Sequence, residues 1–179
     1  MKSRNVMAIA FVTVVFAIVG IVAFAEQDKY ALQVPNGLAF SDFRGYEGWQ
    51  VVSVSFSDNP PVIKVIVANP VMIDAYRAGI PGNGQKFPDG SKIAKIEWIP
   101  KKSTEAPFSV FVPDYQKEVE FIEKDGKRFP DTSGWGYAAF PYDAPSDTFK
   151  PSGNDTKCGY ACHTIAAKKD YIFHSYQHR

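Results

Sequence analysis

The residues best suited to chemistry in this sequence gather near its carboxyl end. Both cysteines of the chain and the first of its three histidines lie in one short segment, Cys158-Gly159-Tyr160-Ala161-Cys162-His163. Covalent attachment of a c-type haem needs two thiols that reach the vinyl groups on one porphyrin edge, followed directly by an imidazole that binds the iron. The segment therefore predicts haem c, with Cys158 and Cys162 as thioether links and His163 as the iron ligand.

The spacing of this segment is C-x-x-x-C-H, one residue longer than the usual C-x-x-C-H. Positions i and i+4 share one face of a helix, so Cys158 and Cys162 can still reach the same porphyrin edge. A local disulfide between the two cysteines is an alternative in an oxidising compartment. A zinc site is less favoured, because a structural zinc ion needs four ligands and this segment offers only two cysteines and His163.

The second axial position of the iron has few candidate ligands. After residue 25 the usual strong ligands besides His163 are Met72, His174 and His178. Met72 falls on the apolar face of a predicted helix, where methionine is typically a core residue. His174 and His178 lie in a tail, where histidines are mostly solvated. We therefore predict an open sixth site, which would bind a small molecule instead of only passing electrons.

The beginning of the chain has the features of an export signal. Lys2 and Arg4 precede an apolar stretch from Val6 to Ala25, which ends in the small-residue pattern Ala23-Phe24-Ala25. This pattern predicts a secretory signal that is cleaved after Ala25. The same stretch is also long enough for an uncleaved membrane anchor. Both alternatives predict that residues 26–179 are periplasmic, either free or anchored to the membrane.

The composition excludes several classes of protein. The chain has 179 residues, 45% of them hydrophobic and 22% charged, which excludes a disordered or collagen-like protein. Its 20 basic and 19 acidic side chains form no basic run, so we expect no nucleic-acid partner. Aromatic residues make up 15%, which favours a core or pocket lined by rings.

Alternating and β-branched segments predict a sheet. Residues 49–56 and 62–68 flank a proline-containing turn and predict two antiparallel strands. The alternation in residues 92–99 predicts a third strand, which contains Lys95. Further strands, separated by turns, are predicted at residues 108–112, 119–123 and 135–140.

The helices are expected to be few and short. Asn69 as N-cap and Pro70 at the first helical position predict a short helix, followed by a loop over residues 80–90. Residues 141–154 predict a long wrapping loop, and residues 161–169 predict a C-terminal helix that carries the haem attachment. Residues 26–41 predict an N-terminal arm or short helix. Together these elements predict an α+β fold, a single mostly antiparallel sheet domain with a few short helices.

The order of these motifs resembles the cytochrome P460 family, which includes the related cytochromes c′-beta. The resemblance covers roughly residues 40–176 and rests on Val65 to Ala68 with Asn69-Pro70, Phe87-Pro88-Asp89-Gly90, Ile93 to Trp98, Glu120-Phe121, Lys124-Asp125, Ser133 to Gly136 and the terminal Cys-Cys-His-Thr stretch. It implies a mostly antiparallel sheet, often assembled as a homodimer, that carries one haem c with an open distal side.

The resemblance also implies roles for three side chains. In P460 enzymes a strand lysine is bonded covalently to the porphyrin, and Lys95 occupies the matching position. Glu120 matches a distal carboxylate that could accept protons from bound hydroxylamine, a role that suits a general base. Lys64 stands where the catalytic relatives carry a pocket arginine, and a lysine cannot reproduce that planar, two-pronged donor.

Three functional hypotheses follow. The first is an exported monohaem cytochrome that oxidises hydroxylamine, with nitric oxide, and passes electrons to a partner redox cytochrome. The second is a non-catalytic cytochrome of the c′-beta type, which binds nitric oxide or transfers electrons. The third is a haem-free exported domain with a disulfide between Cys158 and Cys162.

Overall fold

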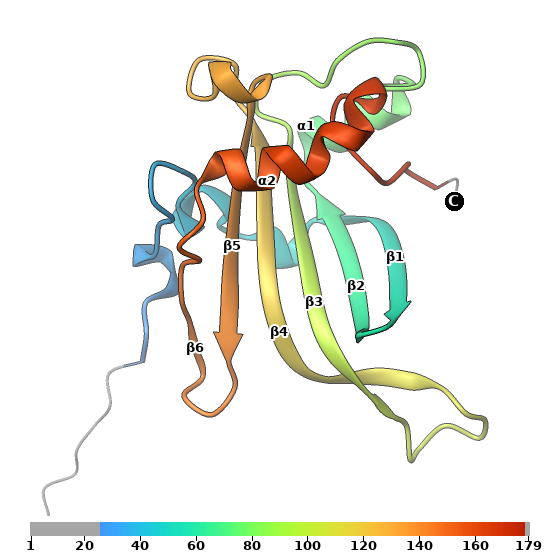
Figure 1. Ribbon diagram of the computed structural model, residues 1–179. Helices are drawn as coiled ribbons and strands as arrows, with labels where there is room; N and C mark the ends of the chain where they lie inside the picture. The colour runs from blue at the N-terminus through green and yellow to red at the C-terminus, as the bar shows by residue number, and fades with distance from the viewer. Residues whose placement is uncertain (1–25, 178–179) are drawn as a thin grey trace, which may run out of the picture.

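The computed structural model describes residues 26–177 and shows an α+β fold, one six-stranded antiparallel sheet with a few short helices (Figure 1). The predicted signal or anchor, residues 1–25, and His178 lie outside the described residues. Among residues 26–177, no helix has the length and apolar character needed to cross a membrane.

The strands follow one another across the sheet in chain order, and each is antiparallel to the next. Their bounds are β1 Gln50–Asp58, β2 Pro61–Ala68, β3 Lys92–Lys102, β4 Phe111–Lys124, β5 Trp135–Asp143 and β6 Thr148–Phe149. The predicted α+β class and the predicted strands around residues 49–56, 62–68, 92–99 and 135–140 are confirmed.

The strand predicted at residues 119–123 is confirmed as part of β4. The separate strand predicted at residues 108–112 was wrong, because β4 begins only at Phe111 and runs on to Lys124 without a break. Pro113 falls between the two predicted strands, where a turn was expected, but it lies inside β4 opposite Pro100. The register of β3 and β4 shifts next to this pair. A proline is tolerated at such an irregularity, because no regular ladder hydrogen bond is lost there.

The long wrapping loop predicted at residues 141–154 is also corrected. Strand β5 continues to Asp143, and the short β6 pairs with it through Phe149 opposite Tyr142. The chain that follows stays beside β5, because the Ser152 amide donates to the Ala139 carbonyl at 2.9 Å. Much of the expected loop is therefore a hairpin and a strand-like return.

Two α-helices are present in the described residues, α1 Pro70–Arg77 and α2 Thr156–His163. Helix α1 begins as predicted, with the Asn69 side chain accepting a hydrogen bond from the Met72 amide at 3.1 Å. Helix α2 begins before the predicted residue 161, because the Asp155 carboxylate caps it. The rest of the predicted helix is the 3₁₀ segment η5, Thr164–Lys169.

Short 3₁₀ segments complete the fold: η1 Lys29–Ala31, η2 Phe40–Phe43, η3 Tyr46–Gly48 and η4 Pro130–Thr132. The first three make up the N-terminal region and cover one face of the sheet. There Phe43 stacks on Phe121 of β4, with ring centroids 4.2 Å apart, inside an aromatic core. This core fixes the back of the sheet.

The opposite face carries α1, α2 and the chain that follows them (Figure 1). Met72 is fully buried there, which confirms its assignment to the core. Helix α2 lies close against β5 at Gly159, where an added Cβ would come 2.5 Å from the Cβ of Tyr137. Glycine therefore permits this close approach, and it sets the height of α2 above the sheet.

Candidate functional site

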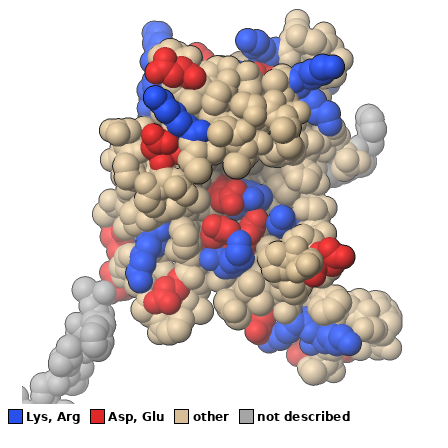
Figure 2. All heavy atoms as spheres, viewed as in Figure 1, with Lys and Arg blue, Asp and Glu red and all other residues tan. Residues whose placement is uncertain are grey.

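The face of the sheet beside α2 is hollowed, and charged side chains gather in the hollow (Figure 2). Two adjoining cavities of about 390 and 370 Å³ share the lining residues Lys95, Glu120, Ile122, His163 and Phe173. The first cavity also contacts Ser55, Lys64 and His174, and the second contacts Cys158, Cys162 and Tyr137. The paired thiols and the strand charges thus border one continuous region.

The structure brings together every site residue predicted from the sequence: Lys64 on β2, Lys95 on β3, Glu120 on β4, and Cys158, Cys162 and His163 on α2. The strand residues meet because Lys95 pairs directly with Glu120 across β3 and β4. Directly paired residues point to the same face of a sheet. Register therefore places these charges under α2.

Cys158 and Cys162 are exposed free thiols, and the structure does not join them in a disulfide. Both lie within α2 and line the second cavity, as their i, i+4 spacing predicts. They are available for two bonds to one planar partner.

His163 is oriented by a single hydrogen bond. Its Nδ1 lies 2.6 Å from the carbonyl oxygen of Tyr171, and since a carbonyl only accepts, Nδ1 carries the proton and donates. The Nε2 atom keeps its lone pair. The ring is packed by Tyr137 and Phe173, with centroids 4.9 and 4.5 Å away. Burial lowers the pKa of His163, which favours the neutral imidazole that binds metals.

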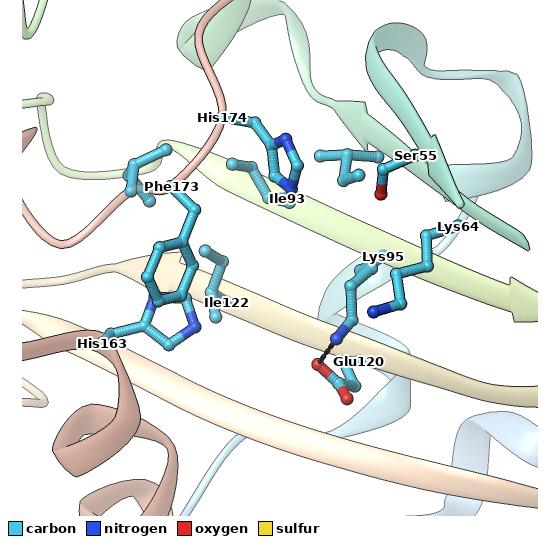
Figure 3. Close-up of a pocket in the computed structure, with 11 residues that line it drawn as sticks. Ser55, Lys64, Ile93, Lys95, Glu120, Ile122, His163, Phe173 and His174 are labelled. Atoms are coloured by element: carbon cyan, nitrogen blue, oxygen red, sulfur yellow. Dashed lines mark ion pairs between the residues drawn. The ribbon is translucent and has the colours of Figure 1, made fainter. Parts of the chain in front are cut away.

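Lys95 is the centre of an ion-pair network on the floor of the hollow. Its Nζ lies 2.5 Å from Glu120 Oε2 (Figure 3) and 3.0 Å from Glu97 Oε1. Glu97 is also paired with Lys117 at 2.7 Å, and Lys117 in turn contacts Glu118. Negative and positive side chains therefore alternate through the network, which spans β3 and β4.

The network fixes the charge of its members. Burial alone would lower the pKa of Lys95, but the charges and hydrogen bonds of Glu120 and Glu97 outweigh it, and the pKa is raised. Burial would raise the pKa of Glu97, but Lys117 and Lys95 lower it to about 2. Lys95 is therefore protonated and Glu97 ionised at neutral pH.

Glu97 belongs to the site, although it was not predicted from the sequence. The sequence contained a pattern that could have identified Glu97. Glu97 is two residues from Lys95 on a predicted strand, and residues i and i+2 of a strand lie on the same face. The expectation that His174 is solvated was also wrong, since His174 is half-buried and lines the first cavity (Figure 3). The chain returns there because the Tyr76 hydroxyl donates to the His174 carbonyl at 3.0 Å.

The donor set fits a c-type haem. Two free thiols on one helix face border a cavity, and the next residue is a neutral imidazole whose Nε2 keeps its lone pair. The walls mix aliphatic and aromatic side chains, among them Ile122, Tyr137 and Phe173. Such walls suit a flat apolar ring system.

A comparison with protein-family models agrees with this chemistry. The model of a protein family described as Cytochrome P460 matches residues 43–174. The matched range includes the strands that carry Lys64, Lys95 and Glu120, and it includes all of α2. A search of curated proteins finds no match.

Proposed function

This chain belongs to the cytochrome P460 family, and on that premise we propose that it is an exported monohaem cytochrome that oxidises hydroxylamine. Membership establishes a haem-binding cytochrome with a c-type haem. We assign the thioether links to Cys158 and Cys162 and the axial bond to His163. The observation that carries this assignment is the His163 imidazole, held by the Tyr171 carbonyl beside both thiols.

A haem c held by Cys158, Cys162 and His163 would supply one-electron redox chemistry and a binding site for a small nitrogenous ligand. Glu120 serves as the proton acceptor, since its carboxylate faces the cavity and is 34% exposed, so it can pass protons to water. Lys95 holds that carboxylate in place by the 2.5 Å contact. The electrons leave to a partner redox cytochrome.

Lys64 is proposed to bind the substrate electrostatically. It lines the first cavity, and its amino end points toward Lys95 and Glu120 (Figure 3). An ammonium group here can attract an electron-rich ligand, although it cannot form the paired hydrogen bonds of a guanidinium. We therefore expect Lys64 to contribute to the affinity for the ligand more than to the orientation of the ligand in the cavity.

Lys95 is the proposed position of a covalent bond to the porphyrin. An amine must lose its proton to act as a nucleophile, and Glu120 and Glu97 keep Lys95 protonated. Formation of the bond would therefore require Lys95 to leave at least one of these carboxylates. It would also require a two-electron oxidant supplied from outside the protein, because a porphyrin C–H bond would be replaced by a C–N bond. This same pairing favours the second candidate function, a c′-beta-type cytochrome that binds nitric oxide without a cross-link or catalysis.

An absorption spectrum and an intact mass of the exported protein test these proposals together. We expect coloured protein whose mass includes one haem, and a Cys158→Ser/Cys162→Ser control that lacks this increment. A spectrum distinct from ordinary haem c, combined with hydroxylamine oxidation, supports the catalytic function with the Lys95 bond. An ordinary haem c spectrum without oxidation supports the c′-beta-type function. Colourless protein whose mass is lower by two hydrogens contradicts both and supports a disulfide.

The same preparation addresses location and assembly. We propose that the protein is periplasmic, free or anchored, and that it forms a homodimer. Recovery from a periplasmic extract with residues 1–25 removed would support the cleaved form, and light scattering would give the mass of the assembly.

A further inference from the structure

A buried ion pair adjoins Tyr171, the residue whose carbonyl contacts His163, and takes no part in the proposed chemistry. Lys124 and Asp170 are only 6% and 5% exposed. The Lys124 Nζ lies 3.0 and 3.2 Å from the two carboxylate oxygens of Asp170. Removing two charges from water costs free energy. A buried charge pair is therefore stable only if further hydrogen bonds satisfy the remaining donors and acceptors of both groups.

Those further hydrogen bonds are present. The Asp170 carboxylate also accepts from the Phe87 amide at 2.9 Å and from the Trp135 indole at 3.4 Å. The Lys124 ammonium also donates to the Ser133 carbonyl at 3.0 Å. The pair therefore joins the end of β4, the loop before β3, the start of β5 and the residue that ends η5.

Asp170 lies immediately before the residue that orients the imidazole. Asp170 and Tyr171 both have positive φ, 48° and 66°, which is unusual for residues other than glycine. Such conformations persist when the surrounding contacts enforce them. The ion pair supplies this restraint at Asp170, and the resulting turn presents the Tyr171 carbonyl to His163 Nδ1 at 2.6 Å.

We propose that the Lys124–Asp170 pair positions the axial ligand, by fixing the Tyr171 carbonyl that holds His163. This inference rests on the proposed role of His163 as iron ligand. A carbonyl that accepts the Nδ1 proton fixes the ring orientation and makes the opposite nitrogen a stronger donor. A stronger donor favours the oxidised over the reduced metal. Lys124 and Asp170 are thus positioning residues that tune the iron without touching it.

The test uses exported holoprotein carrying Asp170→Asn, Lys124→Met or both changes. Each variant is first checked for attached haem by intact mass. The iron–histidine stretching frequency of the reduced protein and the reduction potential are then measured. We expect each single change to lower the frequency and raise the potential, with a shift of about tenfold in the oxidised-to-reduced ratio, roughly 59 mV for one electron. Both residues act through one carbonyl, so the double variant should shift no further than either single variant.

Val119→Ala is the matched control, because Val119 is fully buried in the aromatic core on the opposite face. It should lower stability while leaving the frequency and the potential unchanged. If Asp170→Asn fails to accumulate, Lys124→Met gives the same measurement. Wild-type frequency and potential in haem-loaded variants would overturn the inference. A wild-type protein without attached haem would instead overturn the proposed function.

Discussion

His163, Lys95 and Glu120 have charge states set by their immediate contacts. Burial keeps the His163 imidazole neutral, and the Tyr171 carbonyl assigns its proton to Nδ1. Lys95 stays charged because carboxylates lie at 2.5 and 3.0 Å. The pocket therefore offers a neutral, metal-binding nitrogen on α2 and a charged pair on the strands. The first depends on burial, and the second depends on neighbouring opposite charges.

Glu120→Gln tests the role of the carboxylate as proton acceptor. An amide has nearly the same shape but cannot take the proton, so we expect hydroxylamine oxidation to fall by about 100-fold. The haem mass should not change. The control is Glu105→Gln, since Glu105 lies exposed between β3 and β4. Oxidation at the wild-type rate by Glu120→Gln would show that protons leave by another route.

Helix α2 and strand β5 define the cavity through their close contact at Gly159. The helix is held at its start by the Asp155 cap and approaches Tyr137 closely at Gly159. The thiols are placed relative to the sheet by this packing, because both are on α2. Small changes in the height of the helix should therefore change haem attachment.

Gly159→Ala tests this dependence. The new methyl group would lie 2.5 Å from Tyr137 Cβ and must push α2 away from β5. We expect a loss of about 1–3 kcal/mol in the free energy of unfolding and a smaller fraction of haem-loaded protein. Denaturant unfolding and intact mass measure the two effects.

Gly153→Ala is the control for that change, since its added Cβ meets no atom within 4 Å. It should keep wild-type stability and haem loading. Equal loading in the Gly159 and Gly153 variants would contradict a role for the helix height.

At the scale of the whole molecule, the sheet supports a different structure on each face. The N-terminal segments bury an aromatic core behind it, while the front keeps the cavities and the ion pairs. Glu97 is only 3% exposed, yet it is ionised between Lys95 and Lys117. The stability of the fold therefore depends on the charge of this front face.

The free energy of unfolding should therefore decrease at acidic pH, where Glu97 becomes protonated. The pKa of Glu97 falls from 4.5 to about 2 on folding. Between these two pH values the unfolded chain therefore binds more protons than the folded chain. The contribution of Glu97 is complete above pH 4.5 and is lost as pH falls toward 2. We expect Glu97→Gln to remove on the order of 2 kcal/mol from the unfolding free energy at pH 7, and less at pH 3.

Denaturant unfolding of the holoprotein at both pH values measures this change. Glu105→Gln again serves as control and should follow the wild-type pH profile. A constant difference between Glu97→Gln and wild type at pH 7 and pH 3 would contradict the lowered pKa.

The sequence by itself determined the features that depend on neighbours along the chain. The Asn69 cap, the turn before β2 and the alternation around Lys95 predicted α1 and three strands, because caps, turns and side-chain alternation are local. The i, i+4 spacing of Cys158 and Cys162 placed both thiols on one helix face for the same reason. The continuity of β4 escaped prediction, because Pro113 is tolerated only beside a register shift that involves β3.

Only the tertiary structure decided how these parts meet. Glu97 joins Lys95 and Lys117 through the pairing of β3 with β4, and His174 reaches the cavity because Tyr76 holds the returning chain. The burial of Asp170 against Lys124 likewise joins segments that are far apart in sequence. Such contacts are stabilised by burial and charge between distant residues, and no local pattern specifies which distant residues will be partners.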